Sequence, residues 1–162
     1  MKALMIVLGA VLALGLLVFG LSKFGSSANT AGSQTDDPNA PKVELTEKKY
    51  DFRKIGLNDI AKHEFKLKNV GQKNLIINNL MTSCHCTTAV FKLVGKPDSP
   101  EFGMHQDSNW QGEIPSGSEA AIEVIYSPAK MPVKGQVSRV ITFTTNDPNN
   151  KTVQLEIIAE VQ

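Results

Sequence analysis

Cysteine is scarce in this sequence: among 162 residues it occurs only at Cys84 and Cys86, with His85 between them. No cysteine follows the apolar run at the start of the chain, which excludes a lipoprotein anchor there. A closed structural zinc site is disfavoured as well, because such sites take four ligands, often from paired Cys-x2-Cys units.

Signatures of catalysis are absent too. The chain has no Gly-x-Ser-x-Gly, no His-Glu-x-x-His and no glycine-rich phosphate loop before a helix. A cysteine–histidine nucleophile is formally available from Cys84 or Cys86 with His105, but no third group to orient it is evident. The sequence therefore predicts a non-enzymatic protein with no small-molecule substrate. A thiol oxidoreductase is the one enzymatic alternative that it leaves open.

A large charge of either sign is also missing. The whole chain carries 17 Lys+Arg and 16 Asp+Glu, a net charge of +1. Two of these cations, Lys2 and Lys23, lie in the first 24 residues, which hold no acidic residue, so the remainder has 15 minus 16, or −1. Because phosphate binding needs a basic face, nucleic acid is not predicted as a partner.

The long hydrophobic run of this chain stands at its N-terminus. From Ala3 to Leu21 every residue is apolar or glycine, which is long enough to cross a bilayer and longer than the apolar core of a cleaved signal peptide. Residues 1–24 are therefore predicted to be a signal anchor or a signal peptide. The following domain then lies outside the cytoplasm on a single-pass membrane protein, or in the periplasm if the segment is cleaved.

Residues 25–42 lack large apolar side chains and are predicted to be a flexible linker. Beyond them helical periodicity is absent, and apolar residues alternate with period two. The runs that show this are 63–68, 121–126 and, most clearly, 151–162, and residues 137–145 are rich in Val, Ile, Thr and Phe, which suit a half-buried strand. Turns rich in Gly, Asn, Asp and Pro separate the runs.

This pattern predicts one all-β domain over residues 43–162, an immunoglobulin-like antiparallel β-sandwich of about seven strands. Residues 95–117 break the rhythm, with three prolines, four glycines and the single tryptophan of the chain, Trp110. They are predicted to be a long loop, with Trp110 packing it onto the sandwich.

Five short motifs follow one another along this domain. They are Phe65-x-x-x-Asn69-x-Gly71, Leu75-x-Ile77, Ser83-Cys84-x-Cys86-Thr87, Ile114-Pro115-x-Gly117 and Thr145-Asn146-Asp147. With them, the chain from Val43 to Val161 resembles the bacterial domain of unknown function 1573 family, which is similar in fold to Ig-like domains of the hydin and major-sperm-protein type. The resemblance implies an Ig-like fold with an export signal or a membrane anchor. Position 85 departs from it, because members usually carry glycine or methionine where this chain has His85.

The cysteine pair suggests a soft-metal site. In an extended strand Cys84 and Cys86 share a face, about 6.6 Å apart, and Cu(I) favours thiolate and thioether ligands. The leading hypothesis is therefore a Cu(I) site formed by Cys84 and Cys86 with help from Met104 or His105 in the long loop. His85 points the opposite way in a regular strand and joins the site only if the backbone bends.

Two other interpretations of the pair stay open. A Cys-x-Cys disulfide closes a small ring and suits thiol exchange in principle, although no helix follows Cys86 as it does in the usual Cys-x-x-Cys redox motif. Alternatively the cysteines are structural, and the domain is an interaction module that binds another protein of the cell envelope. His63, on a predicted strand, is expected to face solvent.

Overall fold

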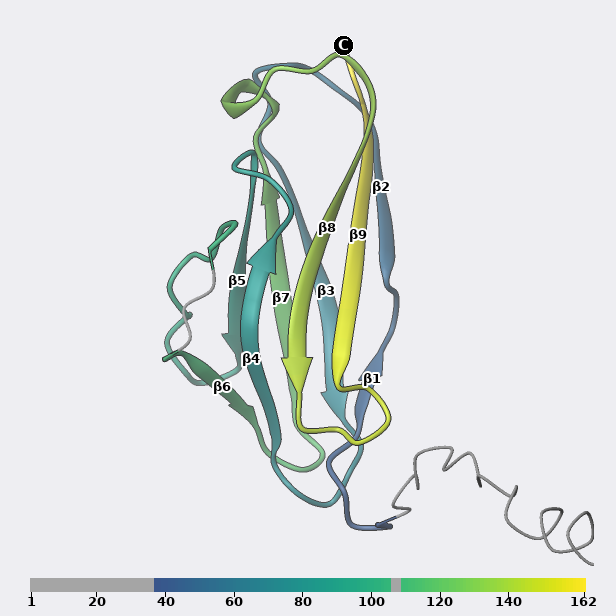
Figure 1. Ribbon diagram of the computed structural model, residues 1–162, viewed down its shortest axis with the longest axis vertical. Coiled ribbons are helices and arrows are strands. Elements are labelled where there is room, and N and C mark those ends of the chain that lie inside the picture. The colour runs from purple at the N-terminus through teal and green to yellow at the C-terminus, as the bar shows by residue number, and fades with distance from the viewer. Residues whose placement is uncertain (1–36, 106–108) are drawn as a thin grey trace, which may run out of the picture. The chain divides into compact units, whose positions relative to one another are not determined.

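The computed structural model describes residues 37–105 and 109–162 (Figure 1). The predicted signal anchor, residues 1–24, and most of the predicted linker lie outside the described residues. Within the part that is described, no helix is both long enough and apolar enough to cross a membrane.

The described residues form nine strands and one short 3-10 helix. They are β1 (Val43–Leu45), β2 (Lys49–Ile55), β3 (Ala61–Asn69), β4 (Leu75–Thr82), β5 (Thr87–Leu93), β6 (Gln111–Ile114), β7 (Glu119–Tyr126), η1 (Pro128–Lys130), β8 (Gly135–Thr145) and β9 (Thr152–Val161). One sheet has the order β1-β3-β7-β5 and the other the order β2-β9-β8-β4-β6. The predicted all-β, Ig-like sandwich is therefore confirmed.

Two details of the prediction were wrong. The described residues hold nine strands rather than about seven, because β1 and β6 are too short to show a clear alternation. The sandwich is also not purely antiparallel, since β2 pairs with β9 in parallel, Tyr50 lying opposite Ile157. A hydrophobic pattern indicates which face of a strand is buried but carries no information about the direction of its neighbour.

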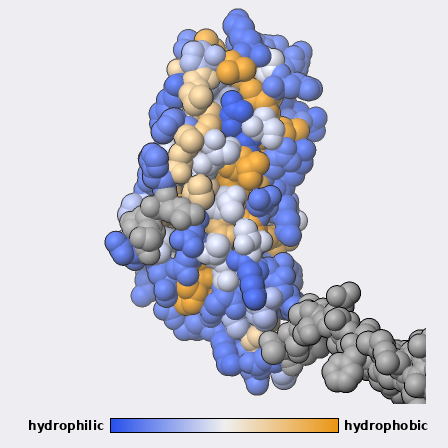
Figure 2. Space-filling view, viewed as in Figure 1, coloured by the Kyte–Doolittle hydropathy of each residue, from blue (hydrophilic) through white to orange (hydrophobic). Residues whose placement is uncertain are grey.

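The core lies between the two sheets, where the alternating apolar side chains of their inner faces meet. The largest fully buried side chains are Tyr126, Phe65, Phe143, Leu67, Leu75, Ile77, Leu80, Ile114, Ile122, Ile141, Leu155 and Ile157. The predicted apolar face of β9, residues 153, 155, 157, 159 and 161, is buried throughout. Accordingly, the face seen in Figure 2 is largely hydrophilic, with hydrophobic residues in small separate groups.

The segment predicted as a long loop, residues 95–117, is only partly loop. It contains β6, and Phe102 forms an isolated bridge with Ala89 of β5. Trp110 packs its ring against Phe91 and Phe102, with centroid distances of 5.5 and 4.8 Å. The prediction that Trp110 fastens this segment to the sandwich is confirmed.

Strand register places two groups of turns at opposite ends of the sandwich (Figure 1). At one end Val43, where β1 begins, pairs with Asn69, the last residue of β3. At the other end Tyr126 pairs with both Ala61 and Thr87, the first residues of β3 and β5. The turn that holds the cysteine pair joins β4 to β5 and therefore lies at the end opposite the start of β1.

Candidate functional site at the Cys-His-Cys turn

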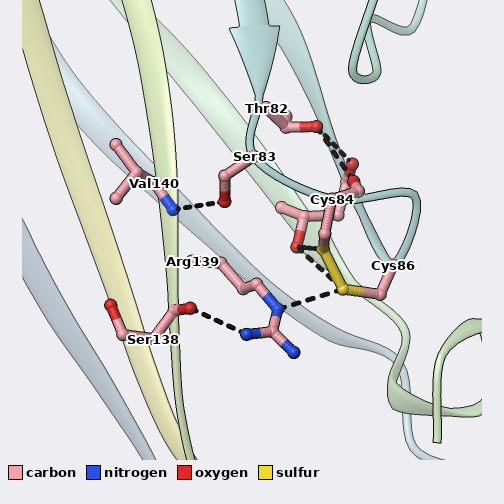
Figure 3. Close-up of a disulfide and its surroundings, with 8 residues drawn as sticks. Thr82, Ser83, Cys84, Cys86, Ser138, Arg139 and Val140 are labelled. Atoms are coloured by element: carbon pink, nitrogen blue, oxygen red, sulfur yellow. Dashed lines mark hydrogen bonds between the residues drawn. A yellow bond between two sulfur atoms is a disulfide. The ribbon is translucent and has the colours of Figure 1, made fainter.

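Hydrogen bonds to the surrounding strands fix the turn between β4 and β5. The amide of Thr87 donates to the carbonyl of Cys84 at 3.2 Å, which closes the turn. The buried hydroxyl of Thr82 lies 2.8 Å from the carbonyl oxygen of Thr87. Ser83 donates to the carbonyl of Val140 and accepts from the Val140 amide, both at 2.9 Å, which ties the turn to β8 (Figure 3).

The two cysteines form a disulfide in this turn, with their Cα atoms 5.3 Å apart. Both are buried, with 7% of Cys84 and 1% of Cys86 exposed. The backbone turns at this point and does not run extended as the sequence pattern suggested. Side chains two positions apart still point to the same side, and the intervening His85 is exposed on the other.

Arg139 of β8 is the charged group beside the sulfur atoms. Its Nε donates to Sγ of Cys86 at 3.1 Å and its Nη1 to the carbonyl of Ser138 at 2.8 Å (Figure 3). Its guanidinium carbon lies 5.8 Å from the ring centroid of Tyr126. Burial raises the pKa of Tyr126, and the Arg139 cation offsets part of that rise. None of the ion pairs among the described residues involves Arg139.

The hydroxyl of Thr87 completes the surroundings of the disulfide. Its Oγ1 lies 3.3 Å from Sγ of Cys84 and 3.8 Å from Sγ of Cys86. The two sulfurs therefore differ in their neighbours, since Cys84 is closer to this hydroxyl and Cys86 is the one that contacts the cation.

Two histidines meet on the outer side of the turn. The ring centroids of His85 and His105 are 6.2 Å apart, with 59° between the ring planes. Both rings line a shallow surface hollow that also includes Met104 and Glu101. Met104 is 37% exposed. The amide of Thr82 donates to the carbonyl of Gly103 at 2.9 Å, which brings this part of the loop beside the turn.

The five residues predicted as metal ligands thus fall into two groups. Cys84 and Cys86 point inward and are joined to each other, while His85, Met104 and His105 share the outer hollow, which no cysteine lines. The sulfur atoms of the pair can act as thiolate ligands only after reduction. Within residues 37–105 and 109–162, no three or more His, Cys, Asp or Glu are grouped so that they could hold a metal ion.

Two packed sheets of mainly antiparallel strands define the Ig-like class of β-domain, and comparison with solved structures agrees on this fold. A protein of unknown function from Porphyromonas gingivalis W83 matches with a TM-score of 0.58 and 18% identity, over 76% of this chain and 48% of its own. This chain therefore spans about half the length of that protein. The seventh PapD-like domain of human CEP192 matches with a TM-score of 0.50 and 14% identity, over 77% of this chain and 88% of the domain. Such low identities show the fold alone.

The family resemblance is confirmed within narrower limits. Residues 43–97 match the family described as "Protein of unknown function (DUF1573)". The match covers the Cys-His-Cys turn but ends before the last two motifs of the predicted resemblance. No curated protein matches the sequence significantly.

Proposed function

We propose that this chain is an Ig-like binding module, held outside the cytoplasm by its N-terminal segment, that takes up Cu(I) at His85, Met104 and His105. The observation that carries the proposal is the approach of two imidazole rings to 6.2 Å in a hollow that also contains a thioether. Imidazole and thioether are both donors that suit copper.

The ring separation suits a bridging metal ion. With metal–nitrogen bonds of about 2 Å, an ion held between one nitrogen of each ring places the centroids about 6 Å apart. Met104 supplies a third, softer donor beside them, and thioethers select Cu(I) over harder ions. His85, Met104 and His105 need only side-chain rotation, because all three already face the same hollow.

The disulfide serves this site by holding His85. Both neighbours of His85 are covalently joined to each other, and Ser83 ties the turn to β8. On the other side, the hydrogen bond from Thr82 to Gly103 positions the Met104–His105 segment. A site whose supporting groups are fixed loses less free energy when it orders around a ligand.

Copper retention tests this proposal. The full-length protein is loaded with Cu(I) kept reduced by ascorbate, without thiols, so that the disulfide persists. We expect one Cu(I) per chain, and a rise of about tenfold or more in the dissociation constant for His85→Ala or His105→Ala, which each remove one of two main ligands. Met104→Leu should weaken binding less.

The third histidine of the chain provides the matched control. His63 lies in β3, stacked on Tyr50 with its Nε2 2.8 Å from Glu47, and has no part in the hollow. His63→Ala should therefore bind copper like the parent. The opposite pattern overturns this assignment: if Cys84→Ser, Cys86→Ser loses copper while the His85→Ala, His105→Ala pair keeps it, the ligands are the sulfur atoms.

The proposed location rests on the sequence. The apolar run from Ala3 to Leu21 is long enough to anchor the chain in the cell membrane, and the disulfide is of the kind that persists in oxidising compartments outside the cytoplasm. The test is to fractionate cells that express the full chain and to wash the membranes with alkaline carbonate. Protein that stays in the washed membranes supports an anchor. Protein that is found in the periplasm with a smaller mass than the full chain supports a cleaved signal peptide.

A second candidate function is binding of another envelope protein. Ile60 is 66% exposed just before β3, and Met131 and Val133 are exposed after β7. Since Ala61 of β3 pairs with Tyr126 of β7, these apolar side chains lie at the same end of the sandwich. Pull-down from membranes with the parent and with Ile60→Ser, Met131→Ser tests this. A partner captured equally by both speaks against this surface.

A further inference from the structure

We infer that Cys84–Cys86 is a redox-active disulfide that accepts two electrons from thiols, with Cys84 as the attacked sulfur and Cys86 as the thiolate that leaves toward Arg139. The inference concerns the inner side of the turn and does not rest on the copper site of the outer side. The exchange is stoichiometric: one chain oxidises one pair of thiols.

The first argument is a cation without an anion. Arg139 directs Nε at Cys86 from 3.1 Å, and no carboxylate of the described residues pairs with it. A neutral sulfur is a weak acceptor for a guanidinium. A thiolate at the same position makes a charge-assisted hydrogen bond, which is considerably stronger. The surroundings of Cys86 therefore fit the reduced state better than the oxidised one.

This preference bears on the redox equilibrium. A disulfide becomes a stronger oxidant when its reduced form is stabilised. Here the stabilising group, Arg139, comes from β8 and acts without a helix. In the usual redox motif the dipole of a helix lowers the pKa of the thiol. In this turn the charge of one side chain, Arg139, takes that role.

The second argument is the asymmetry of the pair. Cys84 is 7% exposed and Cys86 only 1%, so Cys84 is the less deeply buried of the two residues and we assign it as the attacked one. The negative charge then develops on Cys86, which is the sulfur that Arg139 contacts. The attacked sulfur and the sulfur that receives the negative charge are thus the two different ends of the same bond, as thiol–disulfide exchange requires.

The reaction balances with a thiol as the reductant. A thiolate attacks Sγ of Cys84, the bond to Cys86 breaks, and its electron pair stays on Cys86 beside Arg139. A second thiolate attacks the external sulfur of the mixed disulfide, which releases Cys84. Two thiols thereby become one disulfide. Of their two protons one ends on Cys84 and the other goes to water.

The turn has supports that do not depend on the disulfide. Thr82 bonds the carbonyl of Thr87, and Ser83 makes two hydrogen bonds with Val140. Opening the small ring therefore leaves the ends of β4 and β5 held in place, and the reduced pair stays beside Arg139.

Equilibration with glutathione tests the inference. Full-length protein in metal-free buffer is brought to equilibrium over a series of reduced-to-oxidised glutathione ratios, quenched with an alkylating reagent and weighed by mass spectrometry. We expect the parent to become half reduced within this series. Arg139→Gln should need a ratio of [GSH]²/[GSSG] about tenfold higher or more, because it removes the charge that stabilises the thiolate.

Two variants separate charge from structure. Arg139→Lys keeps the cation and should stay closer to the parent than to Arg139→Gln, and Arg53→Gln removes the other arginine of the chain, which lies in β2, and should change nothing. A thermal melt of each oxidised variant checks folding. The inference is overturned if Arg139→Gln leaves the equilibrium within a factor of two, or if the parent disulfide resists glutathione until the protein unfolds.

Discussion

Asp147 shows at the residue scale how one side chain holds an end of this sandwich. It is fully buried. One carboxylate oxygen accepts from the amide of Val43 at 3.0 Å and from Nδ2 of Asn150 at 2.9 Å, and the other accepts from the amide of Asn149 at 2.8 Å. Burial raises the pKa of Asp147, but these donors outweigh it, and the pKa lies below its ordinary value. The carboxylate joins the start of β1 to the turn between β8 and β9.

Asp147→Asn should therefore lower the free energy of unfolding by about 1–3 kcal/mol near neutral pH, since an amide turns one acceptor into a donor. The folded pKa is depressed, so the contribution of Asp147 is present above its unfolded pKa of about 3.9 and is lost as the pH falls through the folded value. Urea unfolding at about pH 7 and about pH 3 should show the difference between parent and variant shrinking in acid. The exposed Asp98→Asn serves as control, and a difference independent of pH would contradict this account.

Side-chain contacts between residues far apart in the chain could not be predicted from the sequence. Cys84, His85 and Cys86 are adjacent, so a motif reveals them together. Arg139 stands 53 positions from Cys86 and only the pairing of strands brings it there. His63 was expected to face solvent, and this was wrong: its ring stacks on Tyr50 at a centroid distance of 3.5 Å. His63 has the same parity as the buried Phe65 and Leu67, so alternation along β3 already turns its side chain inward. Its partner Tyr50 belongs to the other sheet, and the sequence gives no sign of that contact.

Among the elements, the long strands were predictable and the short ones were not. β7 and β9 each bury every second residue over at least eight positions, which is a strong periodic signal, and β3 and β8 bury alternate residues over part of their length. β6 has four residues, and its pairing of Gly112 with Ile77 depends on the position of β4. The Met104–His105 segment is placed by the bridge at Phe102, which is likewise a tertiary contact.

The turn between β3 and β4 carries a prediction at this scale. A Cβ on Gly71 would meet the carbonyl oxygen of Ala40, the backbone nitrogen of Lys42 at 2.5 Å and the Cα of Pro41 at 2.7 Å. These are backbone atoms, so they cannot rotate away. Gly71→Ala should force the chain before β1 off the sandwich and cost about 1–3 kcal/mol of stability, as overpacking usually does.

Gly103 offers the comparison, because a Cβ there meets nothing within 4 Å. Gly103→Ala should change the midpoint of urea unfolding very little, and Gly71→Ala should lower it clearly without changing the slope. If both substitutions changed the midpoint equally, the close approach of the backbone at Gly71 would make no contribution to stability of its own.

On the scale of the whole molecule, the start of β1 and the Cys-His-Cys turn lie at opposite ends of the sandwich. The described chain enters β1 beside Asn69, whereas the Cys-His-Cys turn lies where β5 and β7 meet, at Thr87 and Tyr126. Alternation and turn residues sufficed to predict two packed sheets. The grouping of sulfur, cation and imidazoles around one turn needed the packing of β4, β5 and β8, which no local pattern contains.

The sandwich should remain folded when its disulfide is reduced or removed. A ring of three residues restricts the unfolded chain little, so chain entropy assigns the Cys84–Cys86 bond only about 1.5 kcal/mol, and the apolar core between the sheets does not depend on it. Cys84→Ser, Cys86→Ser should remain folded and melt about 5–10 °C below the parent. Circular dichroism melts of both proteins, with and without a phosphine reductant, measure this. Reductant should lower the melting temperature of the parent alone. If the parent instead unfolds on reduction, no folded dithiol exists for Arg139 to stabilise, and the redox inference is lost together with this prediction.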